Sequence, residues 1–561
     1  MSLCRVLFCC NAYPPHFIGG AELIVEKWAR ALRREQVDAA VFAAESQTHR
    51  GAHYSLHRDE WNEVPVWRVQ TNAQDCLTAN ASFVNPHVEA RFEEVLDEFQ
   101  PDVVHAHNLV GLSVQLLHLA HRRGLRTGLT LHDHWMFCVR NTLTRPDGTR
   151  CDPLAPCDCQ TTLTDLHLGS RLPIDFRSGL IALVADEVDF FHFPSRYLCD
   201  MHVRWGLPRN RCHVIPNGIE TERFDRVRRT PRPAGVRFAF IGHLGAHKGV
   251  RELVEAFACV PSTTGASLDF VGDGDLRSVL EQAAAAAGIG DRVRFRGKIG
   301  NDEIENVYRD VDCLVLPSQW PENHPVSINE AIACGIAVVA TAAGGVPELV
   351  RHGDNGLLVP IGDTRALAQT LEMLARNPER VDSMGAVARR ARGCLALDRA
   401  IDRLRRLYEE PARPTDAISR GRPVTVAIVG RQLAPDQENV CRALTTGDLR
   451  SAIRLVQFDW LRDTQRTHAE VLWLLRDDTS LDEVYLWSGA VVLTGNTSIR
   501  GPQVIACPTA GDAYRAITRI ADRRDEIDDP VLRPANAPAG GDLATWLLSM
   551  ANTEPLHRKF G

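Results

Sequence analysis

Two glutamates eight positions apart, Glu322 and Glu330, offer the clearest chemistry in the chain. The first is expected in a loop and the second near the first turn of the helix that follows. That helix start would leave the backbone N–H groups of Val326, Ser327 and Ile328 free, and free N–H groups at the positive end of a helix dipole bind phosphate. With one carboxylate on a ribose and the other on a sugar, the site would recognise both ends of a nucleotide sugar. The alternative is one solvated acid and one ordinary helix-start charge.

The residues that follow this pair extend the pattern. Glu330 opens the run EAIACGIAVVAT, and the pair Gly344-Gly345 stands shortly before Pro347-Glu348. Together with the glutamate spacing, these features resemble the retaining GT-B glycosyltransferases of family 4. The resemblance extends over roughly residues 3–408. It implies two Rossmann-like domains and a reaction that uses a nucleoside diphosphate sugar.

Two motifs in the first half could contact the same ligand. Gly19 and Gly20 follow the first predicted strand, where glycine lets backbone N–H groups approach a phosphate, although a tight strand-to-helix loop would have the same sequence. His132, Asp133 and His134 begin at a strand end, and the two histidines could be structural or could bind a metal. The resemblance assigns the glycines to the donor phosphates and the acceptor, and it places His132 beside the transferred sugar as a candidate catalytic residue. It leaves His134 for local structure and Asp133 for orienting a neighbouring ring or N–H group.

A third motif, Gly242-His243 with Lys248-Gly249, is similar to the phosphate element G-R-x4-K-G of the family. Lys248 would neutralise the leaving diphosphate, where negative charge develops, and a solvated loop lysine is the alternative. His243 departs from the pattern because it replaces an arginine. Histidine offers at most two donors and is only partly charged near neutrality, whereas arginine offers a permanently charged fork. Donor affinity is therefore expected to be weak or pH-dependent, unless another arginine substitutes.

The resemblance also implies how the reaction proceeds. The leaving phosphate would assist the acceptor hydroxyl on the same face of the sugar, so that neither a protein nucleophile nor a cofactor is required for transfer. Glu322 would bind hydroxyls of the transferred sugar and Glu330 the ribose, with a UDP- or GDP-sugar as the expected donor. A related inverting enzyme would need a general base, for which His132 is the candidate.

Four cysteines, Cys138, Cys151, Cys157 and Cys159, are grouped within 22 residues. Four thiolates in turn-rich sequence could hold a structural zinc ion or an iron–sulfur cluster. Their spacing matches no standard zinc finger, and reduced cysteines or two disulfides are the alternatives. The segment that contains them, residues 138–160, is predicted to be an insertion that could also shape an acceptor pocket.

Strands and helices alternate along the chain in the order that is needed to position these residues. Apolar runs such as Val6 to Cys10 precede helical patterns, and the alternation restarts at Arg237. This predicts an α/β fold with two doubly wound domains facing a cleft. Residues Val214 to Gly218 are predicted to form the hinge. We expect an acceptor-side domain at 1–213, a donor domain at 214–410, a linker at 411–423 and an additional small α/β module at 424–561.

Composition limits the class of protein and its partners. Hydrophobic residues make up 44% and charged residues 24% of the 561 residues, as in ordinary globular proteins. The net charge of −7 gives no sign of a nucleic-acid partner, and no apolar run reaches the roughly 18 residues of a membrane-spanning helix. The N-terminal apolar run is too short for a secretory signal, so a cytoplasmic protein is expected. Basic clusters such as Arg403 with Arg405 and Arg406 are solvated helix faces or peripheral contacts to an anionic membrane.

The leading hypothesis is a hexosyltransferase-type enzyme that transfers a sugar to a hydroxyl of an unidentified acceptor. A glycan, a lipid-linked glycan, a natural product and a protein are all compatible acceptors. The alternative from another class is a catalytically degenerate regulatory protein that binds nucleotide sugars, and His243 keeps this alternative open. A GT-B phosphorylase is disfavoured because no lysine position for a pyridoxal cofactor is evident.

Overall fold

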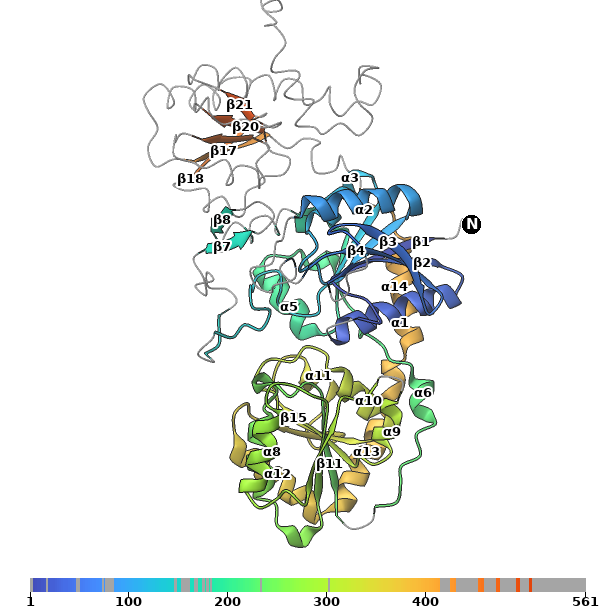
Figure 1. Cartoon of the computed structure of the whole chain (residues 1–561), viewed down its shortest axis with the longest axis vertical. Helices are drawn as coiled ribbons and strands as arrows, with labels where there is room; N and C mark the ends of the chain where they lie inside the picture. Colours follow the sequence, from blue (N-terminus) through green and yellow to red (C-terminus); the bar gives the residue numbers. More distant parts are fainter. Residues whose placement is uncertain are drawn as a thin grey trace, which may run out of the picture.

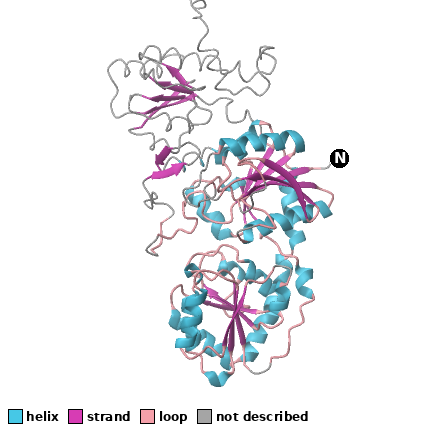
Figure 2. Cartoon of the chain, viewed as in Figure 1, coloured by secondary structure: helices cyan, strands magenta, loops and turns pink. Residues whose placement is uncertain are grey.

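The structure, a computed structural model, contains two α/β domains and a further sheet near the C-terminus (Figure 1). It describes residues 4–16, 19–46, 51–72, 75, 85–145, 149–152, 162–165, 170–173, 177, 181, 184–232, 235–300 and 303–413, together with the backbone of five strands between 424 and 506. Figure 2 shows that helices cover both faces of the sheet in each of the two larger domains. The predicted α/β class with two doubly wound domains is confirmed.

The first domain is built on a sheet with the strand order β10-β9-β6-β5-β1-β2-β4-β3, in which only β3 and β4 are antiparallel. Its strands are β1 (Arg5–Cys10), β2 (Asp38–Glu45), β3 (Leu56–Trp61), β4 (Val64–Gln70), β5 (Val103–Ala106), β6 (Arg126–Thr130), β9 (Phe190–Phe193) and β10 (Cys212–Val214). Its helices are α1 (Gly20–Arg34), α2 (Pro86–Phe99), α3 (Gln115–Arg122), α5 (Arg196–Trp205) and α14 (Leu397–Glu409), and a separate hairpin pairs β7 (Thr162–Asp165) with β8 (Ser170–Pro173).

Strand β1 supplies side chains to both layers of the first domain, because successive residues of a strand point to opposite faces. Leu7 and Cys9 belong to one buried cluster, which also contains side chains of α2, α3 and α5. Val6, Phe8 and Cys10 belong to the other, which contains side chains of α1 and α14. The central strand is therefore buried on both faces.

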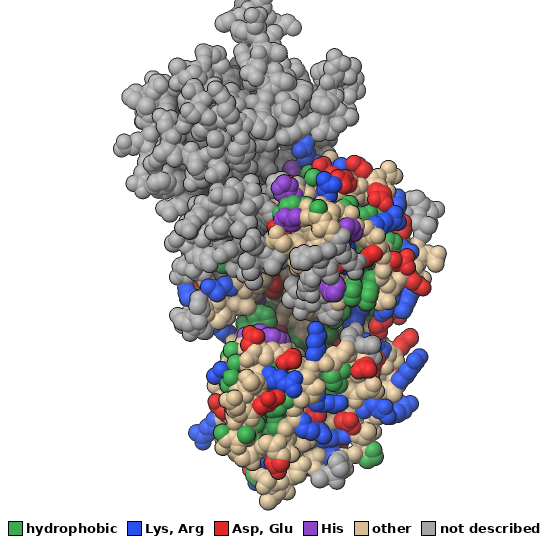
Figure 3. Space-filling view, in the orientation of Figure 1, with side chains coloured by type: hydrophobic (Ala, Val, Ile, Leu, Met, Phe, Trp, Pro, Cys, Tyr) green, Lys and Arg blue, Asp and Glu red, His purple; other side chains and the backbone are tan. Residues whose placement is uncertain are grey.

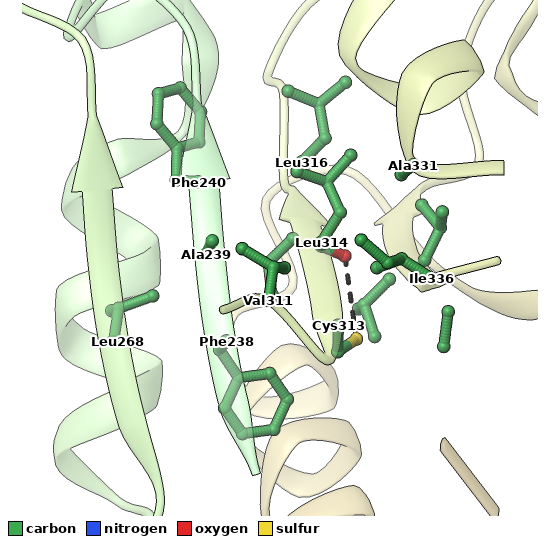
Figure 4. Packing of buried hydrophobic residues seen from close by; sticks show 14 of the residues in the cluster. Phe238, Ala239, Phe240, Leu268, Val311, Cys313, Leu314, Leu316, Ala331 and Ile336 are labelled. Carbon is green, nitrogen blue, oxygen red and sulfur yellow. Dashed lines mark hydrogen bonds between the residues drawn. The ribbon is translucent and has the colours of Figure 1, made fainter. Parts of the chain in front are cut away.

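The second domain has a fully parallel sheet in the order β13-β12-β11-β14-β15-β16. Its strands are β11 (Arg237–Ile241), β12 (Ser267–Val271), β13 (Val293–Gly297), β14 (Cys313–Leu316), β15 (Ala337–Thr341) and β16 (Gly356–Val359). Its helices are α6 (Thr221–Asp225), α7 (Val250–Ala258), α8 (Arg277–Ala286), α9 (Ile304–Tyr308), α10 (Val326–Cys334), α11 (Val346–Leu349), α12 (Thr364–Arg376) and α13 (Pro378–Ala391). Figure 4 shows Phe238, Leu268 and Leu314 packing in its core. The strand order reverses between β11 and β14, and ligands of open α/β sheets bind at such a reversal.

Helix α14 follows the second domain in sequence but packs on the first, beside α1 (Figure 1). Ile401 and Leu404 are fully buried there with Trp28. The guanidinium of Arg126 at the start of β6 donates to the carbonyl of Leu407. These contacts put α14 in the core of the first domain, although the sequence-based limits group it with residues 214–410. The chain thus crosses between the domains twice, and Ile219 pairs with Ala396 where the two crossings meet.

The third sheet is parallel, with the order β18-β17-β19-β20-β21. Its strands are β17 (Val424–Val429), β18 (Ile453–Phe458), β19 (Val471–Leu474), β20 (Val491–Thr494) and β21 (Val504–Ala506). Apolar runs in the sequence predict β17, β19 and β20, whereas a further strand predicted at Tyr485 to Trp487 lies outside the described residues. Numbered along the chain, the order is 2-1-3-4-5, one of the common strand orders of open parallel sheets. The role of this module stays open.

The described surface carries both signs of charge. Figure 3 shows acidic and basic side chains interspersed over the visible face of the two larger domains. Within the described part of the chain, no helix is long and apolar enough to cross a membrane.

The assignment of α14 to the first domain can be tested with two matched truncations. Leu404 in α14 and Leu374 in α12 are both fully buried, and each Leu→Ala change is expected to cost about 2–5 kcal/mol. Leu404→Ala should accelerate amide hydrogen exchange in β1 and α1 and leave the second sheet unchanged. Leu374→Ala should accelerate exchange in the second sheet and leave β1 and α1 unchanged. Faster exchange only in the second sheet of Leu404→Ala would contradict the assignment.

Candidate active site

Loops at the carboxyl ends of both large sheets line one cleft of about 2290 Å³. In the second domain, the loops after β11 and β14 (242–249 and 317–325) meet there because these strands are neighbours. In the first domain, the loops after β1 and β6 reach the opposite wall. The cleft brings together Lys248 and Glu322 on one side and Glu22 and His132 on the other.

Three donors converge on one oxygen of Glu322. The ammonium group of Lys248 lies 2.6 Å from Oε1, the Ser318 hydroxyl donates at 2.6 Å and the Trp320 indole N–H donates at 2.8 Å. Burial opposes ionisation of Glu322, but the charge of Lys248 and these hydrogen bonds outweigh it and hold the pKa of Glu322 below its ordinary value. No described residue donates to Oε2. Glu322 is therefore an ionised, rigidly held carboxylate with one oxygen left to accept from a ligand.

The start of α10 matches the predicted phosphate site in part. Among the described residues, the N–H groups of Val326 and Ser327 have no acceptor, and both residues line the cleft. The prediction is wrong for Ile328, whose N–H donates to the carbonyl of Pro325 at 3.2 Å and whose side chain is buried. Pro325 precedes the helix in an extended conformation, so the first turn closes tightly and uses the third N–H group.

Glu330 lies on the buried side of α10 at the edge of the cleft. Its Oε2 accepts from the Tyr308 hydroxyl at 2.8 Å. Burial raises the pKa of Glu330, while Lys27, Tyr308 and Arg223 act in the opposite direction. The carboxylate thus has a fixed orientation and a neighbouring lysine from the first domain.

Helix α1 begins directly opposite the start of α10. The N–H of Gly19 donates to Glu22 Oε2 at 3.0 Å, and burial raises the pKa of Glu22. A Cβ added at Gly20 would lie 3.4 Å from Val326 Cγ2 in the other domain. The backbone of Gly19 is extended, so this position does not require glycine for its conformation. The Cβ at Gly20 would make an ordinary contact with Val326, so the two helix starts lie close together without either position requiring glycine.

His132 projects from the end of β6 into the cleft, and its Nε2 lies 2.9 Å from Nδ1 of His107 at the end of β5. Burial lowers the pKa of His132 to about 4 and lowers that of His107 as well, so both rings are neutral near pH 7. His107 belongs to none of the motifs described above. The alternating histidines of the segment VHAHN at a strand end are the signal that could have identified it.

A hydrogen-bonded chain lies behind these rings and connects Ile215, at the start of the first crossing, with Tyr408 in α14. Because the Ile215 carbonyl can only accept, His192 Nε2 donates to it at 2.6 Å, and His192 Nδ1 accepts from the Thr130 hydroxyl at 3.0 Å. His105 Nε2 then donates to Thr130 at 2.8 Å, and the Tyr408 hydroxyl of α14 donates to His105 Nδ1 at 2.7 Å. This chain fixes the tautomers of both histidines and anchors the hinge and α14 on the first sheet.

The neighbours of His132 have structural contacts. Asp133 accepts from the N–H of Trp135 at 2.8 Å, and burial raises its pKa to about 6. His134 is buried, its Nδ1 lies 3.2 Å from the Asn141 carbonyl, and its Nε2 is 3.4 Å from the Tyr197 hydroxyl. Both residues therefore brace the loop that carries His132.

His243 is exposed at the rim of the cleft, above Gly245 and Gly274. Its ring stacks on that of His247 at 6.2 Å, and burial lowers the pKa of His247 to about 4. Gly249 stands at φ +69°, where a Cβ would lie 2.0 Å from the Pro317 carbonyl oxygen, so glycine is required there. This close contact brings the Lys248 loop against the loop that carries Glu322.

The cysteine group lies only partly within the described residues. Cys138 is buried and Cys151 is half-buried, and both pack against the core of the first domain. Cys157 and Cys159 lie outside the described residues. Within the described part of the chain, no group of three or more His, Cys, Asp or Glu side chains could hold a metal ion. The four-cysteine site stays a prediction.

Two sequence profiles match adjacent parts of the chain. The profile of Glycosyltransferase Family 4 matches residues 18–223, and that of Glycosyl transferases group 1 matches residues 223–391. The border between the two matches lies close to the crossing between the domains.

Similar proteins share one or both of these parts. An uncharacterized glycosyltransferase of Methanocaldococcus jannaschii is 31% identical over 359 residues, which cover 62% of this chain and 83% of the relative. The amylovoran biosynthesis glycosyltransferase AmsK of Erwinia amylovora is 31% identical over 180 residues, 31% of this chain and 44% of the relative. The N-acetyl-alpha-D-glucosaminyl L-malate synthase of Bacillus anthracis is 35% identical over 142 residues, 25% of this chain and 36% of the relative. The last two matches thus span less than half of each relative.

Solved structures share the fold. Sucrose-phosphate synthase of Thermosynechococcus elongatus superposes with a TM-score of 0.56 at 17% identity, and Anabaena HepE in complex with UDP-glucose with 0.52 at 18%. Each match covers 72% of this chain and 98% of the solved chain. At this identity they show the two-domain GT-B architecture alone. With the profile matches and the Methanocaldococcus relative, they establish that this chain belongs to the family 4 glycosyltransferases.

Proposed function

We propose that the chain transfers a sugar from a nucleoside diphosphate sugar to an acceptor hydroxyl with retention of anomeric configuration. One observation carries the proposal. The ion-paired Lys248 and Glu322 share a cleft with the free N–H groups at the start of α10 and with Glu330, and they lie opposite His132. This arrangement supplies positive charge for a diphosphate and carboxylates for two separate sets of hydroxyls.

In the proposed reaction, the acceptor oxygen bonds to the anomeric carbon while the bond from that carbon to the phosphate oxygen breaks. The acceptor proton passes to an oxygen of the leaving phosphate on the same face of the sugar. Lys248 and the N–H groups of Val326 and Ser327 stabilise the charge that develops on the diphosphate. Glu322 Oε2 accepts from hydroxyls of the transferred sugar, and Glu330 accepts from the ribose.

The expected donor is a UDP- or GDP-sugar, and the UDP-glucose complex of HepE supports a nucleotide sugar in this fold. Gly19, Gly20 and His243 would contact the phosphates from the rim of the cleft. The acceptor would enter between His132 and the loops of the first domain, and its class stays open. No cofactor is assigned to the transfer, because Lys248 and the α10 N-terminus supply the positive charge at the leaving group.

The environment of His132 supports retention over inversion. An inverting reaction would need His132 as a base, but its pKa of about 4 makes it a weak one. The partner of its Nε2 is the neutral ring of His107 rather than a carboxylate, so no charge would stabilise an imidazolium. A neutral His132 suits hydrogen bonding to a sugar hydroxyl.

The alternative, a degenerate binding protein, receives less support. His243 is exposed and replaces an arginine, but the Lys248–Glu322 pair is intact and oriented by Ser318 and Trp320. Release of nucleoside diphosphate separates the two functions, because only the transferase would show it.

The proposal is tested first with a panel of UDP-, GDP-, ADP- and TDP-sugars and the full chain. The correct donor should stabilise the protein by about 3 kcal/mol at a concentration 100-fold above its Kd. It should also release nucleoside diphosphate slowly without an acceptor. Stabilisation without release of nucleoside diphosphate would support the degenerate binding protein. The absence of both effects with every sugar in the panel would refute nucleotide-sugar binding.

Replacing one oxygen of the central carboxylate should abolish most turnover. Glu322→Gln keeps the shape of the side chain but removes its charge, and we expect kcat for diphosphate release to fall by about 10²–10³-fold. Asp269→Asn, which breaks the ion pair with Arg294 outside the cleft, is the matched control and should keep its activity. Equal losses in both variants would mean that Glu322 has only a structural role.

The pH profile tests the state of His132. Because its pKa is lowered to about 4, the ring is neutral above pH 5, and the rate should show no step from His132 between pH 6 and 8. His132→Asn should lower kcat by about 10- to 100-fold without changing the shape of the profile. A step near pH 6.5 that disappears in His132→Asn would instead identify this residue as a general base.

A further inference from the structure

Asn323, which directly follows Glu322, joins the two domains at the cleft. Its Nδ2 donates to the backbone carbonyl of His132 at 2.9 Å. Its Oδ1 accepts from the hydroxyl of Ser195, at the end of β9. One side chain therefore connects the loop of the proposed sugar-binding carboxylate to two strand ends of the first domain.

The direction of these bonds is fixed by Ser195. Its Oγ accepts from the N–H of Leu198 at 3.2 Å and so caps α5. The single hydroxyl proton is then directed to Asn323, which makes Oδ1 the acceptor and Nδ2 the donor. Both the nitrogen and the oxygen of the Asn323 amide are therefore engaged in the contact between the domains.

A second contact lies beside the first. Glu348 in α11 accepts from the N–H of Arg196 at 2.9 Å and from that of Tyr197 at 2.7 Å. These are the first N–H groups of α5, which no residue within that helix can satisfy. A carboxylate from the second domain thus caps a helix of the first, at the positive end of its dipole.

The two contacts belong to one rigid unit because Gly344 and Gly345 press against the Glu322 loop. A Cβ at Gly344 would lie 2.0 Å from the Glu322 carbonyl oxygen, and a Cβ at Gly345 would lie 2.0 Å from that of Asn323. The N–H of Gly345 also donates to the Glu322 carbonyl at 2.7 Å. Helix α11 and the Glu322 loop must therefore move together.

We propose that Asn323 and Glu348 are positioning residues that form a latch with Ser195 and the start of α5. The latch holds the loop of Glu322 against the carbonyl of His132, and so sets the distance between the two walls of the cleft. The donor contacts assigned to Lys248, Glu330 and the N–H groups of α10 lie within the second domain, so the latch should affect donor affinity much less than it affects the approach of His132. Bringing His132 to the transferred sugar does need the latch.

The first test does not depend on enzymatic activity. In the full chain, the amides of Arg196 and Tyr197 should be protected from hydrogen exchange, and Glu348→Ala should accelerate their exchange at least about tenfold. The amide of Ala366, capped at 2.8 Å by Asp363 within the second domain, is the control and should not change. Unchanged exchange at 196 and 197 in Glu348→Ala would overturn the latch.

The second test is a double-mutant cycle across the domains, and its kinetic readout rests on the proposed function. Asn323→Ala and Ser195→Ala should each lower kcat by about 10- to 100-fold, as expected for a misplaced reacting group, while the donor Kd changes by less than about twofold. Because both changes break one contact, the double variant should be no slower than the worse single variant within about threefold. The proposal would be overturned if the two losses of kcat multiplied in the double variant, or if the donor Kd rose as kcat fell.

These two tests separate the latch from the proposed function. A wild-type chain that turns over no nucleotide sugar would refute the function, and the exchange experiment would still decide the latch. A wild-type chain that turns over its donor, with Asn323→Ala equally fast, would refute the latch and leave the function in place.

Discussion

The reversal of strand order between β11 and β14 determines where chemistry can occur in this protein. At every other place in the second sheet, consecutive loops are directed to one face, but at the reversal they diverge and leave a crevice. Lys248 and Glu322 come from the two loops that border this crevice, and α10 starts in it. Gly249 lets the first of these loops approach the second, and Gly344 lets the loop after β15 approach the loop that carries Glu322. An ion pair between residues 74 positions apart follows from this constraint.

The charges inside the cleft leave positive charge and N–H donors available to an anionic ligand. Glu322 is 6% exposed, and a buried carboxylate is costly unless it is paired and hydrogen-bonded. Three donors meet that requirement on one oxygen. The open N–H groups of Val326 and Ser327 and the ammonium of Lys248 then present positive charge toward one region, where an anionic ligand would be stabilised. The site is thus preorganised, and little rearrangement is needed on binding.

In the first domain, hydrogen bonds between neutral side chains, rather than ion pairs, fix the residues behind the cleft. The chain from Tyr408 through His105, Thr130 and His192 to the Ile215 carbonyl satisfies buried ring nitrogens with fixed directions. It fastens the start of the first crossing and helix α14 to the sheet that carries His132. The latch at Asn323 is a separate contact between the domains, made through Ser195 at the end of β9.

The sequence by itself determined the fold class, the order of strands and helices in the two large domains, and most of the cleft residues, because apolar periodicity and motif spacing are local properties. Lys248, Glu322, Glu330 and His132 are found in one cleft as their positions at strand ends and a helix start indicated. Tertiary structure alone decided which neighbours these residues have. The N–H of Ile328 is hydrogen-bonded within a tight first turn, and α14 packs on the first domain and buries its apolar face there. His107, Asn323 and Glu348 contact residues of the site or of the opposite domain. The contacts of Asn323 and Glu348 join residues far apart in sequence, and only the packing of one domain against the other brings them within hydrogen-bonding distance. His107 meets His132 because β5 and β6 are neighbours in one sheet, and the Ile328 bond is local.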